Sequence, residues 1–362
     1  MGLALIGLSL EELQREAGFC GFKPFVARQL ADWLFVKRAS SFDEMTNLSK
    51  SVREILKKNY HIGREAPAGE AESSDGTRKY LFKVCTPLGG SLVEESAIES
   101  VVIPDGDRAT LCVSSQAGCR MNCKFCMTGR GGFHGQIGAA DIINQFLSVK
   151  EAESLTNAVF MGMGEPLDNY DSVCKAIEIL TAPWGFGWSP KRITVSSIGV
   201  IPALKRYLDE QKCHLAISLH NPFGEERVEM MPMEKAYPIK DVVELIRRYD
   251  WSDQRRVSFE YTMFAGWNDD KRHADALIRL LKGLECRVNL IRFHTIPDFK
   301  YGTSSQTVME AFRDRLNANG ITCTIRASRG EDIFAACGLL AGEMRRTEVN
   351  YLHNLENSKY YD

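Results

Sequence analysis

The stretch CRMNCKFC, residues 119–126, places three cysteines within eight residues. It follows an apolar run at residues 110–114 that is typical of a strand, so the cysteines belong on the loop after that strand. With 11 cysteines in a chain of 362 residues, this spacing rarely arises by chance. Iron–sulfur clusters are usually held by four thiolates, and three close ones leave one iron open to another ligand. We therefore predict an iron–sulfur cluster on Cys119, Cys123 and Cys126.

A structural zinc ion is the alternative occupant of this loop. Zinc of that kind takes four Cys or His ligands. His134, eight residues after Cys126, is the only close candidate for the fourth ligand.

From about residue 109 onward, short apolar strands alternate with amphipathic helices. The strand candidates are residues 110–114, 158–161, 193–196, 215–219, 257–261, 288–292 and 322–326. The helix candidates are residues 139–149, 172–180, 201–208, 240–248, 270–281 and 306–319. This alternation implies a parallel sheet, open or curled. We predict an α/β fold with a partial (β/α) barrel at residues 109–345, whose last strand returns beside the first.

The residues before the barrel predict a helical domain at 1–64 and a small β-rich adaptor at 65–108. Helix starts are indicated by a capping box at Ser9–Glu12, by Pro24 in a first turn and by Ser49 as a cap. A polar linker at residues 65–76 precedes strands near residues 80–84 and 101–103. Residues 346–362 form a polar tail.

Composition narrows the class of protein. A net charge of -2 excludes a generally basic coat for nucleic acid but leaves a local patch open. The candidate patch consists of Lys50, Arg53, Lys57 and Lys58. The alternative is that these residues form an ordinary solvated helix face. No apolar run is long enough to span a membrane. The cysteines are spread through the chain and no segment resembles a signal peptide, so we expect a reducing compartment. We expect a cytoplasmic monomer.

Polar residues also follow later predicted strands, where the carboxyl ends of parallel strands meet. The run Gly162-Met163-Gly164-Glu165-Pro166 has glycines that would let the backbone approach a ligand, and Glu165 can accept from an ammonium group. Ser196 and the run Ser218-Leu219-His220 end two further strands. The alternative is that all of these are ordinary turn and strand-end residues.

The spacing CxxxCxxC, with Phe125 before the third cysteine, resembles the cluster loop of the radical S-adenosylmethionine (SAM) superfamily, and residues 162–166 resemble its GGEP-type motif. The resemblance implies a [4Fe–4S] cluster whose open iron binds SAM and passes one electron to it, which releases a 5′-deoxyadenosyl radical. It also implies SAM contacts from Gly164, Glu165, Ser196, Ser218, Leu219 and His220.

Two further cysteines lie in TLCVSSQ, residues 110–116, and RGEDIFAACG, residues 329–338. Taken alone, Cys112 and Cys337 fit buried small residues. Their surroundings resemble, over nearly the whole chain, the family that methylates adenine C2 of 23S rRNA and its relative that methylates C8. That resemblance implies that Cys337 carries a methyl group from one SAM, that a radical from a second SAM activates it, and that Cys112 releases the product through a transient disulfide.

The same resemblance assigns two more residues. Glu99 matches a carboxylate that contacts the target adenine and accepts a proton, although an exposed strand glutamate would also fit the pattern. His294 stands where the family often has an asparagine that contacts SAM, and a histidine can still donate a hydrogen bond there.

The resemblance implies a methyltransferase for an adenosine of 23S rRNA at the peptidyl-transferase centre, and some members also modify an anticodon-loop adenosine of tRNA. The target base must be unstacked, so naked rRNA or an assembly intermediate is the expected partner. An electron donor such as flavodoxin would serve the cluster. Two alternatives stay open: a C8 methyltransferase that confers antibiotic resistance, and a noncatalytic iron–sulfur RNA-binding sensor.

Overall fold

A ten-stranded sheet of order β14-β13-β12-β11-β10-β9-β6-β5-β4-β3 forms the centre of the computed structural model, which describes residues 2–89, 92–252 and 256–342. Seven neighbouring strands run parallel: β6 (Arg108–Cys112), β9 (Asn157–Phe160), β10 (Ile193–Ser197), β11 (His214–Ser218), β12 (Val257–Met263), β13 (Arg287–Arg292) and β14 (Thr322–Ile325). Each overlaps a predicted strand. The chain therefore has the predicted α/β fold with a parallel sheet.

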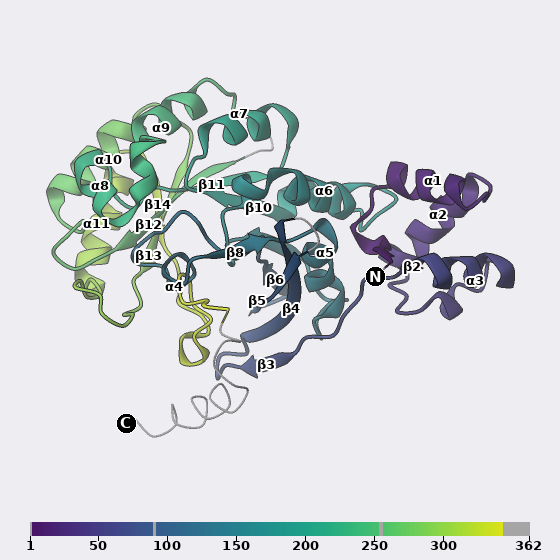
Figure 1. Cartoon of the computed structure of the whole chain (residues 1–362). Helices are drawn as coiled ribbons and strands as arrows, with labels where there is room; N and C mark the ends of the chain where they lie inside the picture. The colour runs from purple at the N-terminus through teal and green to yellow at the C-terminus, as the bar shows by residue number, and fades with distance from the viewer. Residues whose placement is uncertain (1, 90–91, 253–255, 343–362) are drawn as a thin grey trace.

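Amphipathic helices connect these strands and cover the outer face of the sheet (Figure 1). The six predicted helices are α5 (Ala139–Ser148), α6 (Tyr170–Thr181), α7 (Ile201–Glu210), α9 (Ile239–Arg247), α10 (Lys271–Leu281) and α11 (Gln306–Ala318). Two short helices were not predicted, α4 (Met127–Arg130) after the cysteine loop and α8 (Gly224–Met230). Each long helix buries one apolar stripe, as Ile142, Ile143 and Phe146 do in α5.

Three antiparallel strands extend the sheet beyond β6: β5 (Leu92–Asp105), β4 (Arg78–Gly89) and β3 (Gly69–Glu72). The adaptor region thus continues the barrel sheet, while its boundary at residue 108 stays a prediction. Two expectations were wrong. The polar stretch at residues 65–76 is not all linker, because β3 buries Ala71 between two exposed glutamates. The last strand is not the neighbour of the first, because β5 occupies the free edge of β6.

The sheet is nevertheless curled. Arg326, directly after β14, places its Nη1 atom 3.4 Å from Met161 Sδ, directly after β9. Residues from β5 and β6 line one cavity together with residues from β13 and β14. The barrel therefore stays open along one seam, between β6 and β14.

The N-terminal residues form a helical group at one end of the molecule (Figure 1). It contains β1 (Leu3–Ala4), α1 (Leu10–Phe19), α2 (Phe25–Ala31), α3 (Lys50–Asn59) and β2 (Tyr60–His61). The capping box is present, with Glu12 N donating to Ser9 Oγ at 3.2 Å and Ser9 N to Glu12 Oε2 at 2.8 Å. The candidate RNA patch is the exposed face of α3, where Lys57 is already paired with Asp43 at 2.8 Å.

Gly7 joins the helical group to the barrel. A Cβ atom at this position would lie 2.6 Å from Ala140 N, at the start of α5, so only glycine allows this approach. Lys175 of α6 adds an ion pair to Glu12 of α1, with 2.6 Å between Nζ and Oε1. Within the described part of the chain, no helix combines the length and hydrophobicity needed to span a bilayer. The predicted tail at residues 346–362 lies outside that part.

Gly7→Ala should lower the free energy of unfolding by about 1–3 kcal/mol, because the added methyl group must push the helical group away from α5. Urea denaturation of the full chain measures this, and limited proteolysis should cut earlier between the helical group and the barrel. Gly18→Ala is the matched control, because no atom lies within 4 Å of its added Cβ. Equal stability of the Gly7 variant and the wild type would contradict this account of the contact.

Candidate functional site

The three cysteines of residues 119–126 lie on a loop between β7 (Gln116–Gly118) and α4. Backbone hydrogen bonds hold the loop at both ends and in its middle: Cys119 N to Gly132 O at 2.8 Å, Lys124 N to Met230 O at 2.9 Å, and Cys126 N to Cys123 O at 3.2 Å. The loop therefore presents its thiols in one fixed arrangement at the carboxyl end of the barrel strands.

The donor set of this loop fits a cluster better than a zinc ion. Among residues 2–89, 92–252 and 256–342, no three Cys, His, Asp or Glu side chains are placed to hold one metal ion. A cluster needs another arrangement, because its thiolates bind separate irons. His134, the candidate fourth zinc ligand, instead places its Nε2 3.1 Å from Gly131 O and its Nδ1 4.0 Å from Glu94 Oε1. Burial raises the pKa of Cys119 to about 12, and bound iron would supply the positive charge that keeps such thiols ionised.

Glu165 lies buried beside the cysteine loop. Its Oε1 accepts from Leu167 N at 3.1 Å and its Oε2 from Ile198 N at 3.0 Å, while its own N–H donates to Gln116 Oε1 at 2.7 Å. Burial raises the pKa of Glu165 to about 7, and these hydrogen bonds oppose that rise. A ligand ammonium group would favour the ionised form.

The glycines before Glu165 also have a packing role that was not predicted. A Cβ on Gly164, whose φ is +98°, would lie 2.5 Å from Gln116 Cβ, and one on Gly162 would lie 2.7 Å from Ser114 Oγ. The glycines therefore allow the turn to pack against residues 114–116, the entrance to the cysteine loop. That packing fixes Glu165 relative to the cysteines.

His220 is held as a neutral hydrogen-bond donor. Its Nδ1 accepts from Thr262 N at 2.9 Å, which leaves the ring proton on Nε2. Burial, with a contribution from Arg227, lowers the pKa of His220 to about 3, so the ring stays uncharged. Phe125 of the cysteine loop packs against it edge to face, with 5.0 Å between the ring centroids.

One cavity, here called the cofactor cavity, collects most of the predicted cluster and SAM residues. Its lining includes Cys119, Cys123, Cys126, Gly164, Glu165, Ser196, Ser218 and His220. Leu219 does not line it, because its side chain is fully buried and its N–H and C=O are bonded to Glu260 and Arg227. Glu260 was not predicted; it lines the cavity with a buried Oε2 that has no hydrogen-bond partner in the described part of the chain.

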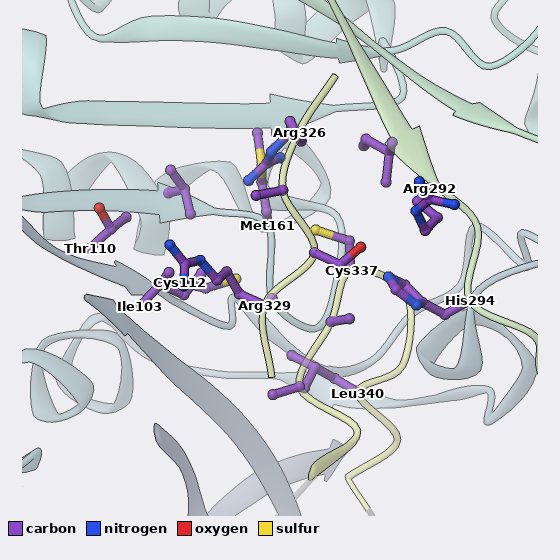
Figure 2. A pocket seen from close by; sticks show the side chains of 18 of the residues that line it. Ile103, Thr110, Cys112, Met161, Arg292, His294, Arg326, Arg329, Cys337 and Leu340 are labelled. Atoms are coloured by element: carbon purple, nitrogen blue, oxygen red, sulfur yellow. The ribbon is translucent and has the colours of Figure 1, made fainter. Parts of the chain in front are cut away.

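A second cavity of about 590 Å³, here called the seam cavity, adjoins the first and follows the open side of the barrel. Cys112, at the end of β6, lines the seam cavity, whereas Cys337 and Arg326 line both cavities. Figure 2 shows Arg326 and Met161 beside Cys337. The structure thus brings the two predicted cysteines to one space, with Cys337 in the wall between the cavities.

The environments of these two thiols differ. Cys337 is exposed, whereas Cys112 is buried. Burial and the nearby Cys337 raise the pKa of Cys112 to about 12, and the positive charge of Arg326 acts in the opposite direction. Arg326 is itself paired with Glu260, with 3.6 Å between Nη1 and Oε2. Sequence reasoning missed Arg326, although a basic residue directly after the last barrel strand is a usable signal.

Glu99 lies beneath the segment that carries Cys337 and lines neither cavity. Its Oε1 pairs with Lys79 Nζ at 3.1 Å, and its Oε2 accepts from Ala341 N at 2.9 Å and from Gly342 N at 3.3 Å. The exposed-glutamate alternative is wrong, because only 2% of Glu99 is exposed. In this arrangement the carboxylate is fully occupied by the protein.

His294 lines the seam cavity and not the cofactor cavity. It is buried, and its Nδ1 lies 3.2 Å from Glu331 Oε1 without the alignment of a hydrogen bond. Its predicted contact with SAM therefore has no support from this arrangement.

Comparisons with known proteins identify the family. Residues 3–62 match the family model "Ribosomal RNA large subunit methyltransferase N-terminal domain", and residues 113–277 match "Radical SAM superfamily". A protein of Porphyromonas gingivalis named "Probable dual-specificity RNA methyltransferase RlmN" is 57% identical over 337 residues, which are 93% of this chain and 96% of that protein. The chain belongs to the RlmN family of radical SAM RNA methyltransferases.

More distant relatives extend this result. The "Dual-specificity RNA methyltransferase RlmN" of Syntrophus aciditrophicus is 41% identical over 340 residues, which are 93% of this chain and 95% of that protein. A crystal structure of a radical SAM methyltransferase from Sphaerobacter thermophilus has a TM-score of 0.87 at 37% identity and covers 94% of this chain and 100% of its own. As an RlmN-family enzyme, the chain uses a [4Fe–4S] cluster and SAM, which confirms the cofactors predicted from the cysteine loop.

SAM binding should weaken by about tenfold between pH 8 and pH 6, because Glu165 gains a proton below a pKa of about 7 and can no longer pair with the SAM ammonium group. Equilibrium dialysis of SAM against the anaerobic, reconstituted enzyme measures this. Glu165→Gln should bind SAM more weakly and lose this pH dependence. The same pH dependence in the variant would assign it to another group.

Proposed function

We propose that the chain methylates C2 of an adenosine in 23S rRNA, and of an anticodon-loop adenosine in tRNA, with Cys337 as the carrier of the methyl group. The observation that carries this proposal is the position of Cys337 in the wall between the cofactor cavity and the seam cavity. From this position Cys337 can receive a methyl group from SAM in the cofactor cavity and deliver it to RNA in the seam cavity. The relatives are named "dual-specificity RNA methyltransferase", and this name supports two classes of RNA substrate.

The chemistry of the target explains why a carrier is needed. Carbon C2 of adenine has no lone pair that could attack a sulfonium, so a direct polar transfer fails. When bound, the cluster supplies the single electron that cleaves SAM and so generates a radical. Glu165 would hold the SAM ammonium group, and the Nε2–H of His220 would donate to an acceptor of the same ligand.

Cys112 is the residue that we assign to product release. A Cys112 thiolate that attacks the sulfur of Cys337 would form a disulfide while the bond between that sulfur and the methylene carbon breaks. The electron pair of the broken bond would pass to the methylene carbon, which takes up a proton and becomes the methyl group of the released base. Arg326 favours the thiolate of Cys112, and it also interacts with Cys337. Both cysteines are free in the described structure.

Glu99 can act on an adenine only after a movement of the chain. Its carboxylate is bonded to Lys79, Ala341 and Gly342, and none of its atoms lines a cavity. We infer that the segment around Cys337 lifts from Glu99 when RNA binds. Flavodoxin as electron donor and a monomeric state stay predictions.

Mass spectrometry of digested RNA tests the regiochemistry. After incubation of the reconstituted enzyme with 23S rRNA and with tRNA, we expect 2-methyladenosine from both. 8-methyladenosine as the sole product would instead establish the C8 alternative. Release of no 5′-deoxyadenosine from SAM by a sample with a full cluster would favour the noncatalytic sensor.

The two cysteine variants test the carrier. Cys112→Ala should accumulate RNA covalently bound through Cys337, because the resolving thiol is missing, and turnover should fall at least about a thousandfold, as for the loss of a nucleophile. Cys337→Ala should cleave SAM weakly and methylate no RNA. Denaturing gels with labelled RNA measure the adduct.

Cys213→Ala is the matched control, because this cysteine is equally buried and lies outside both cavities. Free RNA and normal turnover with the Cys112 variant would remove Cys112 from the mechanism.

A further inference from the structure

The seam cavity is much more basic than the chain as a whole. Among residues 2–89, 92–252 and 256–342, four arginines line it, Arg108, Arg292, Arg326 and Arg329, and Asp105 is the only acidic residue in the lining. The whole chain has a net charge of -2, so this cavity departs from the average of the protein. Its volume of about 590 Å³ lies within the range of about 300–1,000 Å³ that is usual for ligand sites.

Two of the four arginines are neutralised by acidic side chains of the described residues, and two are not. Arg108 pairs with Asp105 at 2.6 Å, and Arg326 pairs with Glu260 at 3.6 Å. The guanidinium of Arg292 is bonded to the uncharged side chain of Gln306 and has no acidic partner among the described residues. For Arg329, the described residues offer no hydrogen-bond or ion-pair partner.

The two unneutralised arginines come from different elements. Arg292 ends β13, and Arg329 belongs to the connection that leaves β14 toward Cys337. Figure 2 shows their side chains on either side of Cys337, within the same cavity. His294 adds a buried ring nitrogen without a hydrogen bond to the same lining. A ligand that satisfied all three groups would carry anionic groups at its two ends and polar atoms between them.

We propose that Arg292 and Arg329 bind the two phosphates that flank the extruded adenosine, one on each side of Cys337. This inference rests on the proposed function and adds the residues that would position the RNA. Arginine is suited to this contact, because its planar guanidinium can donate two parallel hydrogen bonds to one phosphate. The flanking phosphates identify no base, so these arginines would position the target nucleotide and leave its recognition to the groups around Cys337.

RNA binding by Arg292→Gln, Arg329→Gln and the double variant tests the proposal. Each single change should weaken binding of a 23S rRNA fragment by about ten- to hundredfold, as for the loss of a charge-assisted hydrogen bond. It should also reduce the slope of log K against log salt by about one. Arg279→Gln is the matched control, because Arg279 is an exposed arginine of α10 outside the cavity, and its loss should change neither quantity.

A second substrate makes the test specific. A modified RNA, in which uncharged methylphosphonates replace the two flanking phosphates, should bind the wild type more weakly than unmodified RNA does. The double variant should bind the modified and the unmodified RNA with equal affinity. In the proposed function Cys337 receives its methyl group from SAM before any transfer to RNA, so methylation of Cys337 in the variants would show an intact fold and cofactor site. Wild-type RNA affinity and salt slope in the double variant would overturn the phosphate contacts. Absence of RNA methylation by the wild type itself would overturn the proposed function instead.

Discussion

A backbone hydrogen bond of 2.8 Å from Met127 N to Gly338 O ties the segment that carries Cys337 to the helix that follows the cysteine loop. A second bond, from Thr128 Oγ1 to Leu340 O at 2.5 Å, joins the next residue of the helix to the same segment. These contacts join residues about two hundred positions apart in the chain, and they place Cys337 next to Cys126. They fix one side of the segment that forms the wall between the cavities.

The antiparallel adaptor holds the other side of the same segment. Asp332 accepts from Ser73 Oγ at 2.5 Å and from Ser74 N at 3.0 Å, while the buried carboxylate of Glu99 accepts from the N–H groups of Ala341 and Gly342. A buried carboxylate is costly unless it is paired and hydrogen-bonded, and Lys79 completes the pairing here. The adaptor thus stabilises the state in which Ala341 and Gly342 cover Glu99. If RNA in the seam cavity lifts this segment, contacts with the RNA must replace these bonds.

Local sequence was sufficient for much of this architecture. The cysteine loop and the motif that ends in Glu165 are short and follow strands of a parallel sheet, so their meeting at one end of the barrel was predictable from the alternation of elements. The capping box also marked the start of α1 correctly. A partial barrel was predicted, but the alternation of elements did not decide how far it closes or which strand borders β6, and these two features decide which cavity a residue faces. For that reason Leu219 and His294 matched a pattern without facing the cofactor cavity, and the arginines of the seam were not recognised.

The antiparallel strands also determine how the substrate can approach. In a closed barrel of eight parallel strands, inward side chains fill the interior and leave no room for a base. Here β5 pairs with the edge of β6 that would otherwise meet β14, so the parallel part stops at seven strands. The seam that remains runs beside Cys112, and it ends at the wall that carries Cys337. The same pairing that builds the adaptor therefore keeps the barrel open at the seam cavity, where we propose that the nucleotide enters.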